Sequence, residues 1–360
     1  MKKILHVISS LAQGGTESVV INYFNNIDGE KVKFDFLVIW GNSPTFYDDR
    51  LLSQGCRIYR MKHTPKEFFE HGKELREFFE SHKEYDAVHI HAMSSLRFRV
   101  AKAAKKSGVK NVVYHSHTSS TEKHAFLHKL FKNKINKFCD YKFACSRAAG
   151  KYMYNGDFTL VKNAIDLDRF CYNENFGRDL REKFGLTDKF VVGNVGRLTS
   201  SKNQKFLFCV LKELKYIKPN AVLFLIGDGG ELYNLRNEAE RTGLAENVIF
   251  AGNAGADVYK YYSLFDCFAF PSLFEGLSMV LIEAQANGLP IISSDTLSPE
   301  HKISENFTFL PVCETTENYK AWANALSKSA TRTNNRELLV SAGYDIKTEA
   351  EKLQNFYLGL

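Results

Sequence analysis

Long apolar runs and paired cysteines are both missing from this 360-residue sequence. No uninterrupted apolar stretch reaches the roughly 18 residues that span a bilayer, so no transmembrane helix is predicted. The seven cysteines are scattered, odd in number and without a C-x-x-C pair, which indicates reduced thiols in a cytosolic chain. The N-terminal apolar run is interrupted by His6, Ser9 and Ser10, so we expect a buried strand there instead of a signal peptide.

Low-complexity stretches and short repeats are also missing, and the sequence instead alternates apolar strands with helical segments in two series. This alternation predicts an α/β protein with two doubly wound parallel sheets, that is, two Rossmann-like domains with a cleft between their carboxyl edges. The length also favours two domains. We expect strands at 3–8, 34–39, 56–61, 86–91, 111–117, 141–146 and 158–163, then at 190–196, 221–227, 247–252, 267–272 and 290–295. The predicted domains are 1–165 and 166–343, followed by an amphipathic helix in 344–360.

The net charge of +7 is unevenly distributed, because the basic excess lies in the first half. From Arg97 to Lys151 there are 14 basic residues and only two acidic ones, Glu122 and Asp140. Three interpretations remain open for this segment: docking on an anionic membrane, nucleic-acid binding, or an ordinary solvated helix face.

Two carboxylates, Glu275 and Glu283, stand eight residues apart, after an apolar strand and across the start of a predicted helix. Ser278 can cap that helix, and Gly288 with Pro290 can end it. A fully helical spacing would separate the carboxylates by about 12 Å. That distance exceeds the separation in glycosidases and favours a grip on the two ends of an elongated ligand. The alternative is a pair of solvated carboxylates.

Cations and glycines follow three other strands. Arg197 and then Lys202 precede a predicted helix from Asn203, an arrangement suited to a diphosphate. Glycine-rich loops follow the strands that end before Gly14-Gly15 and before Gly227. Neither loop matches the G-x-G-x-x-G pattern, which disfavours a nicotinamide enzyme.

Histidines concentrate at two strand ends, His89 with His91 and His115 with His117. Four histidines can form a metal site, or they can hydrogen-bond sugar hydroxyls and a departing phosphate. We expect one histidine of each pair to be structural and His117 to be the most exposed to substrate. The D-x-D at Asp166–Asp168 lies in the expected interdomain crossing, so we do not interpret it as a metal site.

Together GGTE, the two histidine pairs, NAID, GRLTSSKN, GDG and E-x7-E follow the order seen in retaining glycosyltransferases of family 4, which the chain resembles over nearly its whole length. The resemblance implies a GT-B architecture, a last helix that returns to the first domain, and no metal or other cofactor. The sequence departs from the pattern at Ala164, where many relatives have glycine.

The resemblance also implies roles for individual residues. The diphosphate would be held by Arg197, Lys202 and the Gly15 N–H, and the ribose by Glu283. The donor sugar would contact Glu275, the backbone of Gly276, Leu277 and Ser278, and His117. Gly227 would also belong to the donor site. The acceptor side would include Glu17, His91 and His115.

The sequence thus predicts a cytoplasmic enzyme, peripheral on the inner membrane face, that transfers a hexose from a UDP-sugar to a lipid-linked exopolysaccharide or capsule precursor. Nucleic acid is not an expected partner. The alternatives are a UDP-sugar 2-epimerase, which needs no acceptor, and a catalytically silent nucleotide-sugar-binding partner subunit.

Overall fold

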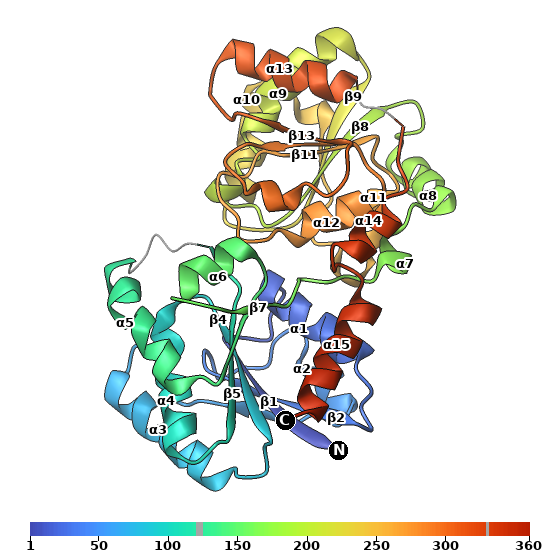
Figure 1. Cartoon of the computed structure of the whole chain (residues 1–360). Helices are drawn as coiled ribbons and strands as arrows, with labels where there is room; N and C mark the ends of the chain where they lie inside the picture. Colours follow the sequence, from blue (N-terminus) through green and yellow to red (C-terminus); the bar gives the residue numbers. More distant parts are fainter. Residues whose placement is uncertain (120–124, 329–330) are drawn as a thin grey trace. The chain divides into compact units, whose positions relative to one another are not determined.

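The computed structural model (Figure 1) describes residues 1–119, 125–328 and 331–360. Glu122, one of the two acidic residues of the basic segment, lies outside these ranges. The chain forms two compact units. The first unit contains Met1–Ile165 together with Asp345–Leu360, and the second contains Asp166–Tyr344.

The first unit is built on a seven-stranded parallel sheet with the order β3-β2-β1-β4-β5-β6-β7. All the strands predicted for this half are present, because each is a short apolar run bounded by turn or helix signals. The strands are β1 (Lys2–Ile8), β2 (Val32–Val38), β3 (Ile58–Arg60), β4 (Ala87–Ala92), β5 (Asn111–Ser116), β6 (Tyr141–Ala144) and β7 (Thr159–Leu160).

Helices cover this sheet, and the last helix of the chain is one of them. They are α1 (Gly15–Asn26), α2 (Asp48–Ser53), α3 (Phe68–Ser81), α4 (Phe98–Lys106), α5 (Ala125–Phe138), α6 (Arg147–Met153) and α15 (Ile346–Leu358), with a 3₁₀ turn, η1 (Ser95–Arg97). Helix α15 packs on α1 and β2 (Figure 1). The Asp345 carboxylate caps it by accepting the Thr348 N–H at 3.1 Å, and the Ile346 N–H donates to the Ile165 carbonyl at 3.0 Å.

The second unit contains a six-stranded parallel sheet with the order β10-β9-β8-β11-β12-β13. Five of these strands match the predicted runs. The sixth, β13, was missed because it is a four-residue edge strand in which Phe307 alone is fully buried. The strands are β8 (Phe190–Val195), β9 (Ala221–Ile226), β10 (Val248–Phe250), β11 (Cys267–Phe270), β12 (Ile291–Ser294) and β13 (Phe307–Leu310).

One helix boundary predicted for the second unit was wrong. The helix expected from Asn203 begins only at Phe206, because Asn203 adopts a left-handed conformation with φ 54°. The helices are α7 (Leu167–Phe170), α8 (Glu174–Phe184), α9 (Phe206–Ile217), α10 (Leu232–Arg241), α11 (Val258–Tyr262), α12 (Met279–Ala286), α13 (Thr316–Ser327) and α14 (Arg336–Ser341). The 3₁₀ turns are η2 (Ser200–Lys202), η3 (Ala245–Asn247), η4 (Gly255–Asp257) and η5 (Pro299–His301).

Helices α9 and α13 pack together and bury Trp322 against one face of the second sheet. Within the described ranges, no helix combines the length and the apolar character needed to cross a bilayer.

Candidate functional site

The two glutamates of the E-x7-E window lie in one βαβ unit, formed by β11, α12 and β12. Glu275 lies in the loop before α12, and Glu283 lies within the helix. Gly288 ends the helix in a left-handed conformation with φ 77°, as its position predicts. Because β11 and β12 are parallel neighbours, the loop containing Glu275 lies at the carboxyl edge of the sheet, where open α/β sheets bind ligands.

Ser278 stands at the N-cap position of α12, but its side chain makes no capping hydrogen bond. Its backbone N–H donates instead to Nε2 of buried His301 at 3.0 Å. The other ring nitrogen of His301, Nδ1, donates to the Ser298 carbonyl at 2.9 Å. The Ser278 N–H expected to contact a sugar is therefore occupied, and His301, which the sequence did not single out, holds the loop in place.

Lys202 and Glu275, predicted to hold different parts of a donor, form an ion pair with each other. Ser272 also donates its hydroxyl to Glu275 Oε1 at 2.8 Å, and the Lys202 ammonium lies 5.1 Å from the centre of the Phe270 ring. Both charged side chains are largely shielded from solvent. A ligand phosphate would thus meet a lysine already directed to this edge of the sheet, but it must compete with a carboxylate.

Arg197 is exposed on the loop that follows β8. Gly227, on the loop after β9, adopts φ 138°, and a Cβ there would lie 2.0 Å from the Gly196 carbonyl oxygen. The Leu198 N–H donates to the Asp228 carbonyl at 2.9 Å, so the two loops are bonded to each other. Glycine at 227 is thus required for the close packing that positions the Arg197 loop.

Glu283 is buried, and its Oε2 accepts a hydrogen bond of 2.6 Å from the Tyr262 hydroxyl of α11. Burial raises the pKa of Glu283 to about 7, although the Tyr262 hydrogen bond opposes this shift. Tyr262 had no distinctive sequence signal, because an aromatic residue in an amphipathic helix is ordinarily a core residue.

In the first unit, α1 begins with Gly14 as N-cap and Gly15 as its first residue. Gly15 is exposed, and open space lies where its Cβ would stand. The Glu17 carboxylate folds back over this helix start, where it accepts the Ser10 hydroxyl at 3.1 Å and lies against Gly14. The N-terminus of α1 therefore has space for a ligand at Gly15 and a carboxylate beside it.

Arg97, the first residue of the basic segment, is half-buried near the same edge and donates from Nη2 to the Ser9 hydroxyl. Its Nη1 has no hydrogen-bond partner among the described residues, and burial lowers the pKa of its guanidinium to about 10. The sequence identified Arg97 as one charge in a run, and gave no sign that its guanidinium would be partly withdrawn from solvent.

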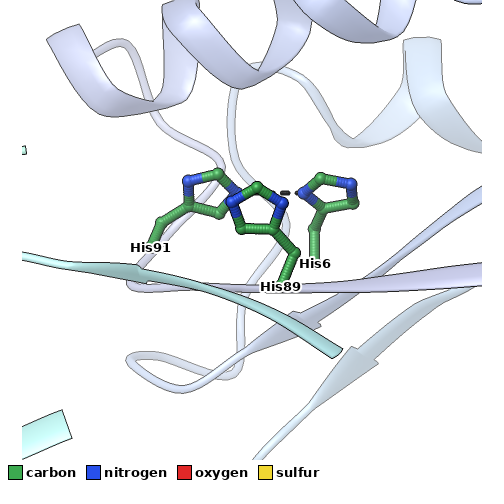
Figure 2. Close-up of side chains that lie close together, drawn as sticks. All are labelled: His6, His89 and His91. Atoms are coloured by element: carbon green, nitrogen blue, oxygen red, sulfur yellow. Dashed lines mark hydrogen bonds between the residues drawn. The ribbon is translucent and has the colours of Figure 1, made fainter. Parts of the chain in front are cut away.

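The predicted histidines come together with a fifth, His6 of β1. Strands β1, β4 and β5 are neighbours, and the register pairs His6 with His89 and His91 with His115. Figure 2 shows the rings of His6, His89 and His91 side by side on one face. His117 is the most exposed of the four predicted residues, but at 7% exposure it is still buried.

The D-x-D aspartates have structural partners. Asp166 caps α7 by accepting the N–H groups of Asp168 and Arg169 at 3.0 and 3.1 Å, and Asp168 forms an ion pair of 2.7 Å with Arg336. The Ala164 carbonyl, at the position where the family pattern departs, accepts the Asn22 side-chain amide at 3.1 Å.

Two family models cover most of the chain: "Glycosyltransferase Family 4" matches residues 13–169, and "Glycosyl transferases group 1" matches residues 177–345. The putative glycosyltransferase EpsF of Bacillus subtilis is 30% identical over 99% of this chain and 96% of its own length. An Escherichia coli UDP-Gal:alpha-D-GlcNAc-diphosphoundecaprenol alpha-1,3-galactosyltransferase is 29% identical over 59% of this chain and 58% of its own.

Among solved structures, Anabaena HepE in complex with UDP aligns over 100% of both chains with a TM-score of 0.79 at 18% identity. A sucrose-phosphate synthase from Thermosynechococcus elongatus aligns over 99% of this chain and 98% of its own, with a TM-score of 0.77 and 19% identity. Two parallel-sheet α/β units with these neighbours define the GT-B fold. The chain belongs to glycosyltransferase family 4.

Proposed function

We propose that this glycosyltransferase moves a hexose from a UDP-sugar to a glycan acceptor, with retention of the anomeric configuration and without a metal ion. The observation that carries the proposal is the Lys202–Glu275 ion pair at the carboxyl edge of the second sheet, with Glu275 in the loop that leads into the helix of buried Glu283. A cation and two carboxylates are thereby available for the phosphate, sugar and ribose of one donor. The UDP complex of the Anabaena neighbour supports UDP as the nucleotide.

The ion pair suggests how the donor engages the second unit. The diphosphate draws Lys202 away from Glu275, and exposed Arg197 adds a second cation. Glu275, once released, accepts hydrogen bonds from hydroxyls of the donor sugar. The backbone of Gly276 and Leu277 contacts the same sugar. Lys202 thereby exchanges one anionic partner for another, and the Glu275 carboxylate exchanges its ammonium partner for hydroxyl donors.

Transfer then breaks the bond between the sugar C1 and the β-phosphate oxygen, and a bond forms between C1 and the acceptor oxygen on the same face. The acceptor proton passes to an oxygen of the departing diphosphate, so no protein carboxylate needs to act as nucleophile. Arg197, Lys202 and the Gly15 N–H stabilise the negative charge that develops on the leaving group. His117 contacts the transferred sugar.

Glu283 holds the ribose hydroxyls through its carboxylate, which accepts hydrogen bonds best when ionised. Since its pKa is raised to about 7, donor affinity should weaken as the pH falls below about 7. We assign Glu17, His91 and His115 to the acceptor side of the reaction.

The acceptor is a lipid-linked exopolysaccharide or capsule precursor, in keeping with the diphosphoundecaprenol acceptor named for the E. coli relative. Helix α5 suits the membrane surface that carries such a lipid. Its Phe126 and Leu130 are 78% and 56% exposed, and exposed Lys129 and Lys134 lie beside them along the helix. Exposed aromatic and aliphatic side chains among lysines favour a lipid interface over a purely solvated face.

Liposome co-sedimentation tests the membrane step. The triple change of Lys132, Lys134 and Lys137 to Glu should abolish binding to vesicles rich in anionic lipid. The matched control changes Lys183, Lys189 and Lys212, exposed lysines of the second unit, to Glu and should bind normally. Equal binding by both triple variants would refute membrane docking through α5.

The reaction itself is tested by incubating the enzyme with UDP-sugars, lipid-linked acceptors and EDTA. UDP release and the anomeric configuration of the product are then measured by NMR. Acceptor-dependent release of UDP with an unchanged anomeric configuration supports the proposal. Epimerised UDP-sugar in the absence of acceptor identifies a 2-epimerase instead, and UDP binding without any turnover identifies a silent partner subunit.

A further inference from the structure

A chain of hydrogen-bonded imidazoles crosses the first sheet. His6 Nδ1 lies 2.9 Å from His91 Nε2, and His91 Nδ1 lies 2.9 Å from His117 Nε2. The free ends of the chain, His6 Nε2 and His117 Nδ1, are buried and have no partner among the described residues. His91 therefore uses both ring nitrogens within the chain, whereas each end residue has one nitrogen left over.

Burial keeps these rings neutral. It lowers the pKa of His6 and of His117 to about 3, and it lowers the pKa of His91 well below its usual value. Each neutral ring carries one proton, and each N···N hydrogen bond needs one donor and one acceptor. Only two arrangements satisfy both bonds: every proton on Nδ1, or every proton on Nε2.

The two arrangements present opposite chemistry at His117. With the protons on Nδ1, His117 offers an N–H donor at its free nitrogen, and His6 ends in a lone pair. With the protons on Nε2, His117 offers a lone pair, and His6 ends in an unpaired N–H. The buried N–H without an acceptor is costly wherever it lies, so a ligand that pairs with His117 Nδ1 selects one arrangement for the whole chain.

A metal ion is the competing interpretation, because the nitrogens of His6, His89 and His91, and those of His91, His115 and His117, lie within 4.8 Å of one another. Two nitrogens that bind one tetrahedral zinc ion at about 2.0–2.1 Å lie roughly 3.3 Å apart, wider than the 2.9 Å in the chain. The rings of His89 and His91 also stack with an interplanar angle of 9°, which directs their in-plane lone pairs side by side instead of toward one point. The geometry favours hydrogen bonding.

We infer that His6 and His91 are positioning residues whose tautomers are coupled to that of His117, so that the donor or acceptor character of His117 Nδ1 depends on rings up to two hydrogen bonds away. The part of this inference that concerns catalysis rests on the proposed role of His117 in sugar transfer. The coupling of the three tautomers rests only on the hydrogen-bonded chain.

His89 provides a matched control. It lies on the same strand as His91, it is equally buried, and its ring stacks on both His6 and His91. Its hydrogen bonds run elsewhere, because Nε2 contacts His115 Nδ1 at 3.2 Å and Nδ1 contacts the Tyr357 hydroxyl. His89→Phe and His6→Phe thus remove equally buried imidazoles, but only His6→Phe shortens the chain.

Nitrogen NMR of protein labelled with ¹⁵N-histidine reads the tautomer of each ring directly. In the wild-type protein we expect His6, His91 and His117 to share one tautomer, and no ring to titrate between pH 5 and 8. His6→Phe should change the His117 ring shifts. In a protein that already carries His91→Phe, adding His6→Phe should cause no further change at His117. His89→Phe should leave the His117 tautomer unchanged. Different tautomers within the wild-type chain, or stoichiometric metal found by elemental analysis, would overturn the inference without requiring any variant to fold.

Turnover separates this inference from the proposed function. With UDP binding retained, His6→Phe should lower kcat at least about tenfold, and His89→Phe should leave kcat near the wild-type value. If His6→Phe retains full kcat, the positioning role is refuted while sugar transfer stands. If the wild-type protein binds no nucleoside diphosphate, the proposed function fails, whatever the tautomers show.

Discussion

The buried carboxyl of Glu283 makes the stability of the protein depend on pH. Its raised pKa means that between about pH 4.5 and 7 the folded protein holds a proton that the unfolded chain has released, so this carboxyl lowers stability as the pH rises through that window. Glu283→Gln removes the ionisable group and retains the polar contact with Tyr262. We expect the variant to match wild type near pH 4 and to exceed its free energy of unfolding by up to about 3 kcal/mol at pH 8.

Urea denaturation at a series of pH values measures this effect. Glu351→Gln, which removes an exposed carboxylate, serves as the control and should give no such divergence. Parallel curves for Glu283→Gln and wild type across pH 4–8 would contradict the buried, proton-holding state of Glu283.

Because Lys202 and Glu275 form an ion pair, we expect removal of the lysine charge and removal of the carboxylate charge to change UDP affinity by different amounts. Lys202→Ala removes the proposed phosphate ligand and should weaken UDP binding by about 1.5–3 kcal/mol. Glu275→Gln releases Lys202 from its competitor, so UDP should bind at least as tightly as it does to wild type, although the donor sugar loses a contact. Calorimetric titration with UDP measures both affinities.

Lys205→Ala is the control for this series, because Lys205 is exposed and contacts Glu238 at 3.7 Å. Weaker UDP binding by Glu275→Gln than by Lys202→Ala would show that the carboxylate, not the lysine, holds the nucleotide.

At the scale of elements, the packed loops after β8 and β9 predict a glycine-specific effect. Gly227→Ala would place a methyl group against the Gly196 carbonyl in a conformation that alanine rarely adopts. We expect a loss of at least about 1–3 kcal/mol in stability and a raised KM for the donor, because the Arg197 loop must shift. Gly230→Ala, in the same loop with open space around its Cβ, is the matched control. Similar melting temperatures for the two variants would contradict this account of the loops.

The elements also show how far the sequence determines this structure. Apolar runs bounded by turn residues predicted the seven strands of the first sheet and five strands of the second, because buried parallel strands are nearly continuous in hydrophobicity. The edge strand β13 escaped because a short strand with one buried phenylalanine lacks that signal. The start of α9 was misplaced because the left-handed conformation of Asn203 depends on its surroundings.

Contacts between distant segments could not be predicted from the sequence, because they depend on how the elements pack in space. His301 supports the Ser278 loop from η5, and Tyr262 reaches Glu283 from another helix. The motifs did identify Lys202 and Glu275, but their ion pair depends on how two loops meet in space. His6 was identified only as an interruption in an apolar strand, and its place in the imidazole chain follows from strand order, which brings β1 beside β4.

At the scale of the whole molecule, the two units carry different chemistry. The second unit holds the cation and carboxylates suited to a nucleotide-sugar, and the first unit holds the histidines, the glycine-rich start of α1 and the basic helix α5. This division is consistent with the proposed function, in which the second unit recognises the donor and the first serves the acceptor.

The most direct test of the central claim is thermal unfolding of the purified protein with EDTA present and with UDP, GDP, ADP or NAD added in turn. A ligand that binds only the folded state must raise the melting temperature. We predict a rise with UDP that is diminished in Lys202→Ala and in Glu283→Ala but retained in Lys205→Ala. A rise with NAD alone, or no rise with any nucleoside diphosphate, would contradict a UDP-sugar-dependent glycosyltransferase.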